Sequence, residues 1–311
     1  MPTGSPAPDT EPAPPAAPRA AHATGHRVGL VIGSGGLKCA AALGLWRVLE
    51  REGIPVDVAV GCSGGAIYAA GFALGEDRRS AEERSLYMWN DLFTRLHVRS
   101  LLGALAPRLF GFGDRVGLVD DRRVWRVMEA AYGDRTFADA RIPLHVAATD
   151  WRTGEKVVLS SGRVADAVRA SIALPLLLRA WEIDGRLLVD GGASNPLPID
   201  VAILDGCDVI VAMGFENHVR PHVDSLRAAL GRTTTIASNH LLKATFAFYN
   251  LAHHAELIPV VPSIGRPVAL TDTHLIPELI RLGEQAAEEQ LPYLLRLLAA
   301  PAARPGAGGA S

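Results

Sequence analysis

A repeated strand–glycine–helix pattern in the first quarter of the chain constrains the fold more than any other feature. Arg27 to Gly33 is a β-branched apolar run ended by glycine, and Leu37 to Glu52 follows with apolar residues at helical spacing. Val56 to Gly61 is a second short apolar run, which leads through the glycine-flanked Ser63 into the alanine-rich segment Ala66 to Gly75. Buried strands that alternate with helices pair in parallel. The order therefore predicts a parallel βαβα unit.

The rest of the chain continues this α/β pattern. The segment from about Asp77 to Tyr132 looks mostly helical, and from about Glu216 onward the pattern is helical again, with Leu275 to Leu298 the clearest amphipathic stretch. Between them the sequence predicts strands at Ile142–Thr149, Lys156–Leu159, Arg186–Val189 and Asp208–Met213, and a helix at Val164–Ser171. No internal repeat is visible.

Composition excludes several classes of protein. The 311 residues are 49% hydrophobic, so the chain can bury a core, and the net charge of -2 gives no general attraction to nucleic acid. The three cysteines, Cys39, Cys62 and Cys207, show no metal-ligand spacing and suit a reducing compartment. Neither a disulfide framework nor structural zinc is expected.

Both ends of the sequence have the composition of flexible tails. Residues 1–26 are rich in proline and alanine, with seven prolines in the first 18 positions and no apolar run typical of a signal peptide. Residues 301–311 are small and rich in proline and glycine. The uncharged run from Val58 to Gly75 contains five glycines, so we do not expect it to span a membrane.

The segment Gly61-Cys62-Ser63-Gly64-Gly65 matches the Gly-x-Ser-x-Gly nucleophile elbow. In that motif small neighbours allow a serine to occupy a strained strand-to-helix turn and to project its hydroxyl group outward. The strand expected before Ser63 and the helix expected after it favour this interpretation over a tight turn with an inert serine. A serine hydroxyl is a weak nucleophile by itself, so the hypothesis requires a base and an oxyanion site.

The loop Gly33-Ser34-Gly35-Gly36 is the candidate oxyanion site. It lies between the first strand and its helix, where backbone N–H groups converge at a helix N-terminus. The alternative is a dinucleotide-binding loop of the form G-x-G-x-x-G. Lys38 occupies the third glycine position and Asp57 stands too near the start of the second strand, which argues against a nucleotide.

Asp190 is the candidate base. It ends a predicted strand and is followed by two glycines, so we expect its carboxylate at the carboxyl-end edge of a parallel sheet, beside Ser63. An aspartate at its ordinary pKa is a poor base for an alcohol, so the pair requires a raised pKa or strong oxyanion stabilisation. The alternatives are a simple Asp-Gly turn, or a Ser-His-Asp triad completed by His145, His253 or His254.

Three blocks of sequence resemble the patatin-like phospholipase family, in the order found there. They are Gly33-Ser34-Gly35-Gly36-Leu37-Lys38, the elbow Gly61–Gly65, and Asp190-Gly191-Gly192 with the following Asn195-Pro196-Leu197-Pro198. Similar stretches also occur at Ala147–Gly162, Ala170–Pro175 and Asp200–Met213. The resemblance covers roughly Val28 to Met213, and an ordered set of three motifs is far more specific than any one of them.

The resemblance implies a three-layer α/β/α sandwich with a mainly parallel central sheet and additional C-terminal helices. It implies a catalytic domain over residues 27–215 and a mostly helical extension of the same domain over residues 216–300. Ser63 would be the nucleophile, Asp190 the base, and the Gly35 and Gly36 amides the oxyanion donors, with no metal and no cofactor. The residues that would support the motifs are Gly33, Ser34, Lys38, Gly61, Gly65, Gly191 and Gly192.

The sequence departs from the family pattern at two positions. Ser34 stands where many members have glycine, and Cys39 stands where a glycine usually closes the motif. A differently shaped loop at these positions would leave a catalytically silent lipid-binding module. Lys38 would either bias the loop toward an anion or lie in solvent at the helix start. Cys62 is interpreted as a small packing residue rather than a reactive thiol.

The function implied is a serine acyl hydrolase that cleaves acyl esters of lipids through an acyl-enzyme intermediate, in a soluble cytoplasmic or peripherally membrane-bound protein. An acyltransferase using the same two residues is the first alternative. The expected partner is a lipid or another acyl-ester substrate, not nucleic acid, and the oligomeric state stays open. The apolar segment Leu101 to Phe112 is interpreted either as a mobile cap near the site or as a buried helix pair.

Overall fold

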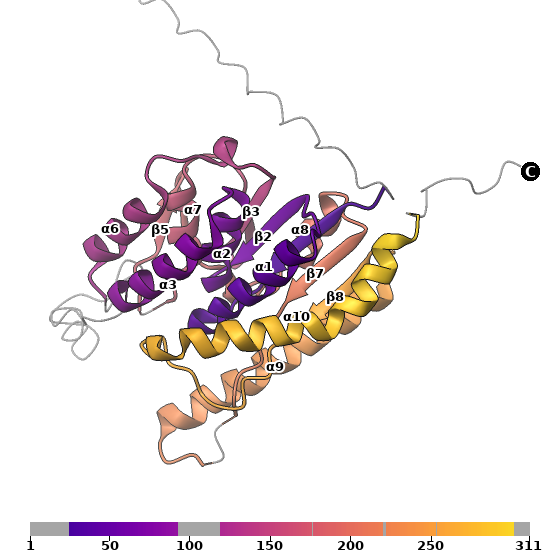
Figure 1. Cartoon of the computed structure of the whole chain (residues 1–311). Coiled ribbons are helices and arrows are strands. Elements are labelled where there is room, and N and C mark those ends of the chain that lie inside the picture. Colours follow the sequence, from indigo (N-terminus) through magenta and orange to yellow (C-terminus); the bar gives the residue numbers. More distant parts are fainter. Residues whose placement is uncertain (1–24, 93–118, 176, 220–221, 253, 302–311) are drawn as a thin grey trace, which may run out of the picture.

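A computed structural model describes residues 25–92, 119–175, 177–219, 222–252 and 254–301. Its centre is an eight-stranded mixed sheet in the order β5-β6-β3-β2-β1-β7-β8, with β4 paired to β3 (Figure 1). Strands β1, β2, β3, β7 and β8 run parallel to one another, whereas β4 and β6 are antiparallel to β3, and β5 is antiparallel to β6. The strands are β1 Val28–Ile32, β2 Val58–Cys62, β3 Leu144–Asp150, β4 Lys156–Leu159, β5 Trp181–Ile183, β6 Arg186–Asp190, β7 Val209–Met213 and β8 Glu256–Val260.

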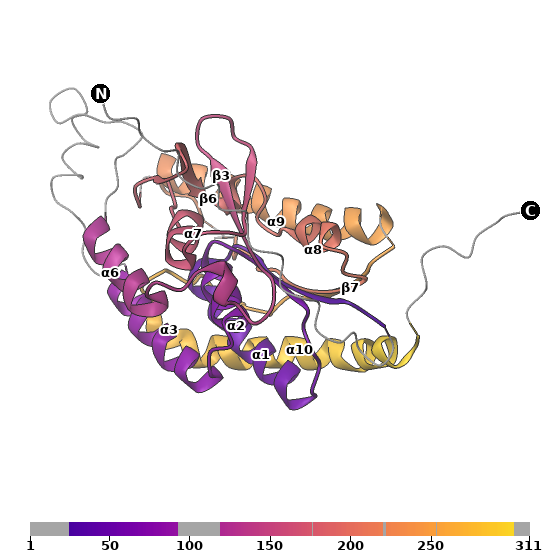
Figure 2. The same ribbon diagram turned by 90° about the horizontal axis from the view of Figure 1, so that it is seen from above.

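Helices cover both faces of this sheet. The α-helices are α1 Ala42–Arg51, α2 Gly64–Ala73, α3 Arg78–Leu92, α6 Asp121–Tyr132, α7 Val164–Ser171, α8 Ile199–Leu204, α9 Leu226–Ala252 and α10 Ile276–Ala299. Short 3-10 helices are η1 Gly36–Ala41, η2 Phe137–Asp139, η3 Gly191–Ala193 and η4 Thr273–Leu275. Figure 2 shows α8 and α9 on one side of the sheet and α1, α2 and α10 on the other.

Alternation along the central strands explains the three layers. In β1, Leu30 and Ile32 point into the larger core with α1, α2 and α10, while Val31 points into a smaller core with α8 and α9. Because successive side chains of a strand face opposite sides, a strand that is apolar at every position must be covered on both faces. The predicted α/β/α sandwich with a mainly parallel sheet is confirmed.

The parallel strands place three loops at one edge of the sheet. Ile32, at the end of β1, pairs with Gly61 of β2 and with Met213, the last residue of β7. The chain therefore leaves β1, β2 and β7 at neighbouring points. The loops that follow them form one end of the molecule.

Asp190 reaches this end by a route other than the expected one. Strand β6 is antiparallel to β3, so its carboxyl end does not lie at the carboxyl-end edge of the parallel strands. Instead, Ala147 of β3 pairs with Cys62 of β2, and the next residue of β3, Ala148, pairs with Asp190 of β6. Strand β4 pairs with the same two residues of β3 from the opposite edge, so β2 and β6 share one edge of β3. Strands β2 and β6 thus meet end to end along β3, which brings Asp190 next to Ser63.

The C-terminal part departs from a purely helical pattern. The amphipathic stretch forms α10 as expected, but Glu256–Val260 is a strand, β8, which extends the sheet beside β7. Its Pro259 cannot donate a backbone hydrogen bond, and an edge strand tolerates that loss. Helix α8 and strand β5 are also additions to the expected pattern. No helix among the described residues is both long and apolar enough to cross a bilayer, and the segment Leu101 to Phe112 lies outside the described residues.

Candidate active site

Ser63 occupies a sharp turn between a strand and a helix. It directly follows β2 and precedes α2, with φ 56° and ψ −130°, a positive φ that few non-glycine residues adopt. Such backbone strain is typical of functional sites. Gly65 makes the turn sterically feasible, because a Cβ atom there would lie 2.3 Å from the carbonyl oxygen of Ile32. Ser63 therefore occupies a strained, closely packed turn between β2 and α2.

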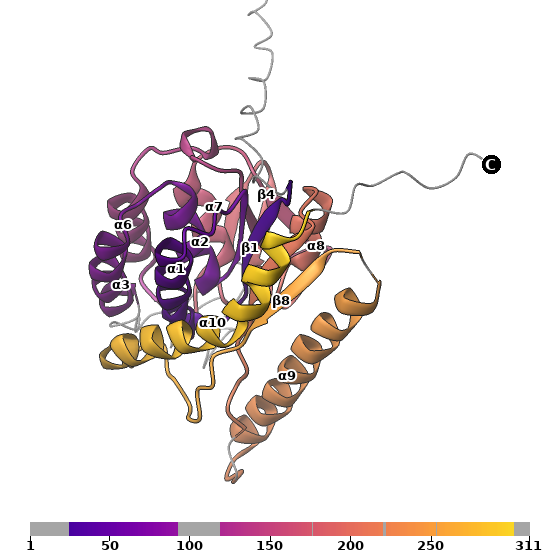
Figure 3. The same cartoon turned by 45° about the vertical axis from the view of Figure 1, so that its right-hand side comes forward.

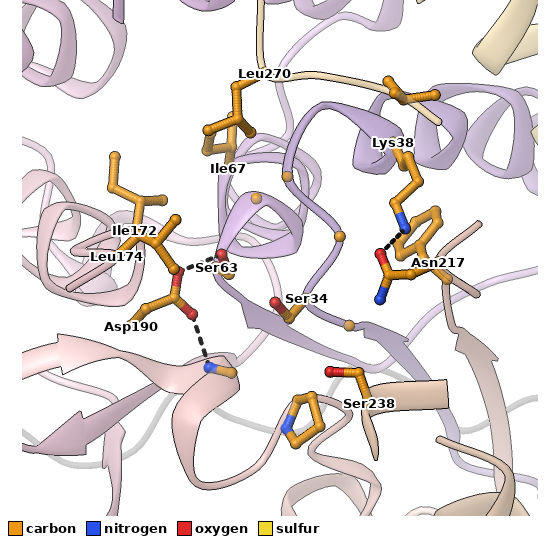
Figure 4. A pocket seen from close by; sticks show the side chains of 18 of the residues that line it. Ser34, Lys38, Ser63, Ile67, Ile172, Leu174, Asp190, Asn217, Ser238 and Leu270 are labelled. Atoms are coloured by element: carbon orange, nitrogen blue, oxygen red, sulfur yellow. Dashed lines mark hydrogen bonds between the residues drawn. The ribbon is translucent and has the colours of Figure 1, made fainter. Parts of the chain in front are cut away.

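The Ser63 hydroxyl group donates a hydrogen bond to a buried carboxylate. Its Oγ lies 2.6 Å from Oδ2 of Asp190, and the other carboxylate oxygen, Oδ1, accepts the Gly192 N–H at 2.8 Å (Figure 4). Only 4% of Asp190 is exposed to solvent. Burial penalises the charged form and raises the pKa of Asp190 to about 6, although the hydrogen bonds from Ser63 and Gly192 act in the opposite direction. At neutral pH this carboxylate is mostly ionised but more basic than an ordinary aspartate.

Two further side chains fix the backbone around this pair. Ser171, fully buried in α7, accepts the Ser63 N–H at 2.8 Å and donates to the carbonyl oxygen of Ala147 at 2.7 Å. Thr149 donates to the carbonyl oxygen of Asp190 at 2.9 Å. The sequence analysis did not single out either residue, although Ser171 lies in the Ala170–Pro175 stretch that resembles the family. Because the Ser63 amide is engaged with Ser171, it is not free to face a ligand.

The glycine-rich loop after β1 has two backbone amides that donate to carbonyl groups and two, those of Gly35 and Gly36, that have no acceptor among the described residues. Gly33 and Ser34 donate their N–H groups to the carbonyl oxygens of Met213 and Pro196, at 2.9 Å and 2.7 Å. Gly35 and Gly36 follow at the start of η1, where the first N–H groups of a helix have no partner within the helix. Gly36 has φ 58°, a conformation that favours glycine. The loop thus presents N–H groups at a helix N-terminus.

The two departures from the family pattern lie on different sides of this loop. Cys39 is buried beneath it, and its Sγ lies 3.4 Å from the carbonyl oxygen of Gly33. Ser34 borders the cavity (Figure 4), and its Oγ lies 2.7 Å from the position that a Cβ atom would take at Gly192. Cys62 is fully buried, and burial raises the pKa of its thiol well above the ordinary value, as expected for a packing residue.

Lys38 lies across the cavity from Ser63 and Asp190, and it is buried rather than solvated. Its ammonium group donates to Oδ1 of Asn217 at 2.7 Å and to the carbonyl oxygen of Glu216 at 3.0 Å. Burial lowers the pKa of Lys38 to about 8. These contacts tie the start of η1 to the segment that follows β7.

A single cavity with a volume of about 330 Å³ is lined both by the Ser63–Asp190 pair and by the glycine-rich loop with Lys38. Its lining includes Gly33, Ser34, Gly35, Gly36, Lys38, Ser63, Asp190 and Gly192 from the sequence-predicted set. Gly61, Gly65 and Gly191 lie outside this lining, within the packing around it. Much of the remaining wall is apolar, with Ile67, Ile172, Leu174, Phe215, Leu242 and Leu270. Such a cavity suits an apolar chain next to a polar reacting group.

Two of the three histidines considered for a triad, His145 and His254, lie away from this cavity. His145 contacts Oδ1 of Asp205 at 3.3 Å and does not line the cavity. His254 precedes β8, and the first residue of β8 pairs with the first residue of β7. His254 therefore lies at the amino ends of the parallel strands, at the end of the sheet remote from Ser63. His253 lies outside the described residues. The described part of the chain holds no cluster of three or more His, Cys, Asp or Glu residues that could bind a metal ion.

Comparisons with known proteins extend the similarity beyond the motifs. An uncharacterized NTE family protein of Mycobacterium tuberculosis H37Rv is 27% identical over 244 residues, which cover 78% of this chain and 63% of that protein. Patatin-like phospholipase domain-containing protein 7 of Rattus norvegicus is 32% identical over 198 residues, 61% of this chain and 14% of that protein. The chain therefore spans less than two thirds of the length of these relatives.

Among solved structures, VipD from Legionella pneumophila aligns with a TM-score of 0.46 and 12% identity, covering 88% of this chain and 69% of that one. The model of the family described as patatin-like phospholipase matches residues 30–203, more than half of the chain; the match runs from within β1 to within α8 and contains Ser63 and Asp190. The chain belongs to the patatin-like phospholipase family.

Proposed function

We propose that this protein is a serine acyl hydrolase that cleaves acyl esters of lipids, with Ser63 as nucleophile and Asp190 as base. The observation that carries the proposal is the 2.6 Å hydrogen bond from the Ser63 hydroxyl group to a buried carboxylate whose pKa is raised to about 6. A general base works best when its pKa lies near the working pH. The family membership and the apolar cavity wall support a lipid as the source of the ester.

In the acylation step, Oγ of Ser63 attacks the ester carbonyl carbon while Oδ2 of Asp190 takes the hydroxyl proton. The carbonyl oxygen becomes an oxyanion, and the Gly35 and Gly36 amides are the donors assigned to it. The tetrahedral intermediate then expels the alcohol part of the lipid, which receives the proton from Asp190. An acyl group remains bonded to Ser63.

In the deacylation step the same groups act on water. Asp190 removes a proton from a water molecule, whose oxygen attacks the acyl carbonyl carbon, and the oxyanion again accepts hydrogen bonds from the glycine loop. Collapse of this second intermediate breaks the bond to Ser63, which regains its proton from Asp190. The products are a fatty acid and the free enzyme.

Intact-mass spectrometry with a fluorophosphonate tests the proposal. Wild-type protein should gain one phosphonyl group, and Ser63→Ala should gain none; both Ser63→Ala and Asp190→Asn should lose hydrolysis of p-nitrophenyl butyrate by at least about 1,000-fold. Ser194→Ala is a matched control, because it removes a hydroxyl group that contacts Thr149 rather than Asp190. Full activity in Ser63→Ala, or labelling at another residue, would refute the proposed mechanism.

A further inference from the structure

The segment that follows β7, residues 214–217, supports the glycine-rich loop. A Cβ atom at Gly35 would lie 2.5 Å from the ring of Phe215, so this buried ring fills the space beside the loop. The ammonium group of Lys38 donates to oxygens of the next two residues of the segment, at 3.0 Å and 2.7 Å. Lys38 is the third residue of η1, two positions after Gly36. The same segment therefore contacts the loop and anchors the helix that begins there.

Asn239, on α9, holds the backbone of Asn217 in this segment through both ends of its side-chain amide. Its Oδ1 accepts the Asn217 N–H at 2.7 Å, and its Nδ2 donates to the Asn217 carbonyl oxygen at 2.8 Å. Two bonds of this kind are what a neighbouring antiparallel strand would supply, but β7 has ended at Met213. The position requires an acceptor and a donor in one short side chain, which asparagine has and an ionised aspartate lacks.

Helix α9 is fixed to the sheet on the side that carries Asn239. The helix lies beside β8 at the periphery of the molecule (Figure 3), and its Leu242, Phe246 and Tyr249 pack against the smaller core. These residues follow Asn239 at intervals of three, four and three, so all four share one face of the helix. Ser238 and Leu242 also line the cavity of the candidate active site. The helix that supplies the amide is thus part of the cavity wall.

We propose that Asn239 is a positioning residue for the proposed reaction: acting through Asn217 and Lys38, it fixes the two amides assigned to the oxyanion. Such donors stabilise an oxyanion well only when they are held in place before the reaction, because they then need not reorganise. The inference rests on the proposed function for its effect on catalysis. Residues 217 and 239 lie beyond residues 30–203, which the family model matches, so the shared motifs do not contain this pair.

Two substitutions at position 239 and one control, all in the full-length protein, test this role. Asn239→Ala removes both bonds to Asn217. Asn239→Asp keeps the acceptor and the shape of the side chain, but it loses the donor and sets a carboxylate against the Asn217 carbonyl oxygen. Asn250→Ala is the control, because it makes the same substitution at an exposed position of the same helix. Alanine has the higher helix propensity, so neither alanine variant should weaken α9 itself.

Hydrogen exchange followed by mass spectrometry measures the loop directly and needs no turnover. The Gly33 and Ser34 amides are bonded to carbonyl oxygens, so a peptide of residues 33–41 contains amides that exchange only when the loop opens. We expect this peptide to exchange at least about fivefold faster in both Asn239 variants than in the parent and the control. Residues 144–159, in β3 and β4, should exchange at the parent rate.

Hydrolysis of p-nitrophenyl butyrate measures the consequence for catalysis. Both Asn239 variants should lose about 10- to 100-fold in kcat, per site titrated with fluorophosphonate, while KM changes by less than about threefold. A trifluoromethyl ketone, whose adduct with Ser63 carries an oxyanion, should bind more weakly by the factor lost in kcat/KM. A merely structural role would lower the number of titrated sites and leave kcat per site and the ketone affinity unchanged.

Three results would overturn the proposal. The first is exchange of residues 33–41 at the parent rate in both Asn239 variants. The second is faster exchange with unchanged kcat and unchanged ketone affinity, and the third is an equal effect of Asn250→Ala. A parent protein that neither hydrolyses the ester nor reacts with fluorophosphonate refutes the proposed function instead, and the exchange result alone then decides whether Asn239 holds the loop.

Discussion

Replacement of Asp190 by asparagine should abolish the part of the pH dependence of the free energy of unfolding that Asp190 contributes. The substitution keeps the size and shape of the side chain and leaves an oxygen to accept the Gly192 N–H, but it removes the titratable group. In the wild-type protein burial raises the pKa of Asp190 from 3.8 to about 6. The folded state therefore binds this proton more tightly than the unfolded chain does.

The magnitude follows from linkage between protonation and folding. A rise in pKa from 3.8 to about 6 corresponds to about 3 kcal/mol of free energy between the two protonation states. For a group whose pKa is raised on folding, this stability is fully present below the unfolded pKa of 3.8 and is lost as the pH rises through about 6. The free energy of unfolding of Asp190→Asn relative to wild type should therefore increase by about 2.5 kcal/mol between pH 4 and pH 7.5, because the unfolded chain is already partly ionised at pH 4.

Urea unfolding of both proteins across this range measures the effect. Because all other titratable groups are common to the two proteins, the difference between their curves isolates Asp190. Asp139→Asn is the control, since hydrogen bonds from Thr136 lower the pKa of that carboxyl and confine its effect to the acid side of the range. Its curve should run parallel to wild type from pH 7.5 to pH 5.

Parallel curves for wild type and Asp190→Asn would refute this reasoning. That outcome would mean that Asp190 titrates in the folded protein as it does in the unfolded chain, and the case for it as a near-neutral base would fail. Ser63→Ala provides an internal check. Removal of a hydrogen bond that lowers the pKa of Asp190 should move the decline in stability to higher pH.

Three further predictions follow from the packing: two concern substitutions and one concerns the reactivity of the cysteines. Ser171→Ala should cost about 1–3 kcal/mol and lower kcat more than it raises KM, because it leaves the buried Ser63 N–H unpaired; unchanged urea unfolding would contradict this. Gly65→Ala should destabilise by at least about 1–3 kcal/mol, since the new Cβ would meet the Ile32 carbonyl oxygen, whereas Gly231→Ala, with open space around it, should be neutral or stabilising in thermal unfolding. Burial raises the pKa of all three cysteine thiols. Iodoacetamide at pH 8 should therefore label no cysteine in the folded protein and all three in urea, as counted by mass spectrometry. Rapid labelling of the folded protein would refute that burial.

Local sequence patterns were sufficient for most elements of the fold. The β4 and α7 boundaries agree at both ends with the expected ranges, and the long C-terminal helix differs by one residue at each end. Strand β8 was missed because its five residues include Pro259 and have no strand-like alternation that distinguishes them from a loop. It is a strand because β7 offers an unpaired edge beside it.

Some residues of the candidate site could be predicted from local sequence patterns, and others could not. The motif around Ser63 could be read from the sequence, because a strained turn between a strand and a helix requires small residues at fixed positions. Ser171 and Asn217 carry no such local signal, since a buried hydroxyl or amide group finds its partner through tertiary packing. The contacts of Lys38 with Glu216 and Asn217 join residues that lie far apart in the chain.

The sequence by itself determined the parallel strands, the helices between them and the small residues around the turn at Ser63, because these depend on hydrophobic periodicity and on glycine at particular backbone positions. Only the tertiary structure decided how Asp190 meets Ser63. The end-to-end placement of β2 and β6 along β3 depends on register between strands distant in sequence. Burial of the pair, and with it the raised pKa of Asp190, exists only when the layers have closed around it.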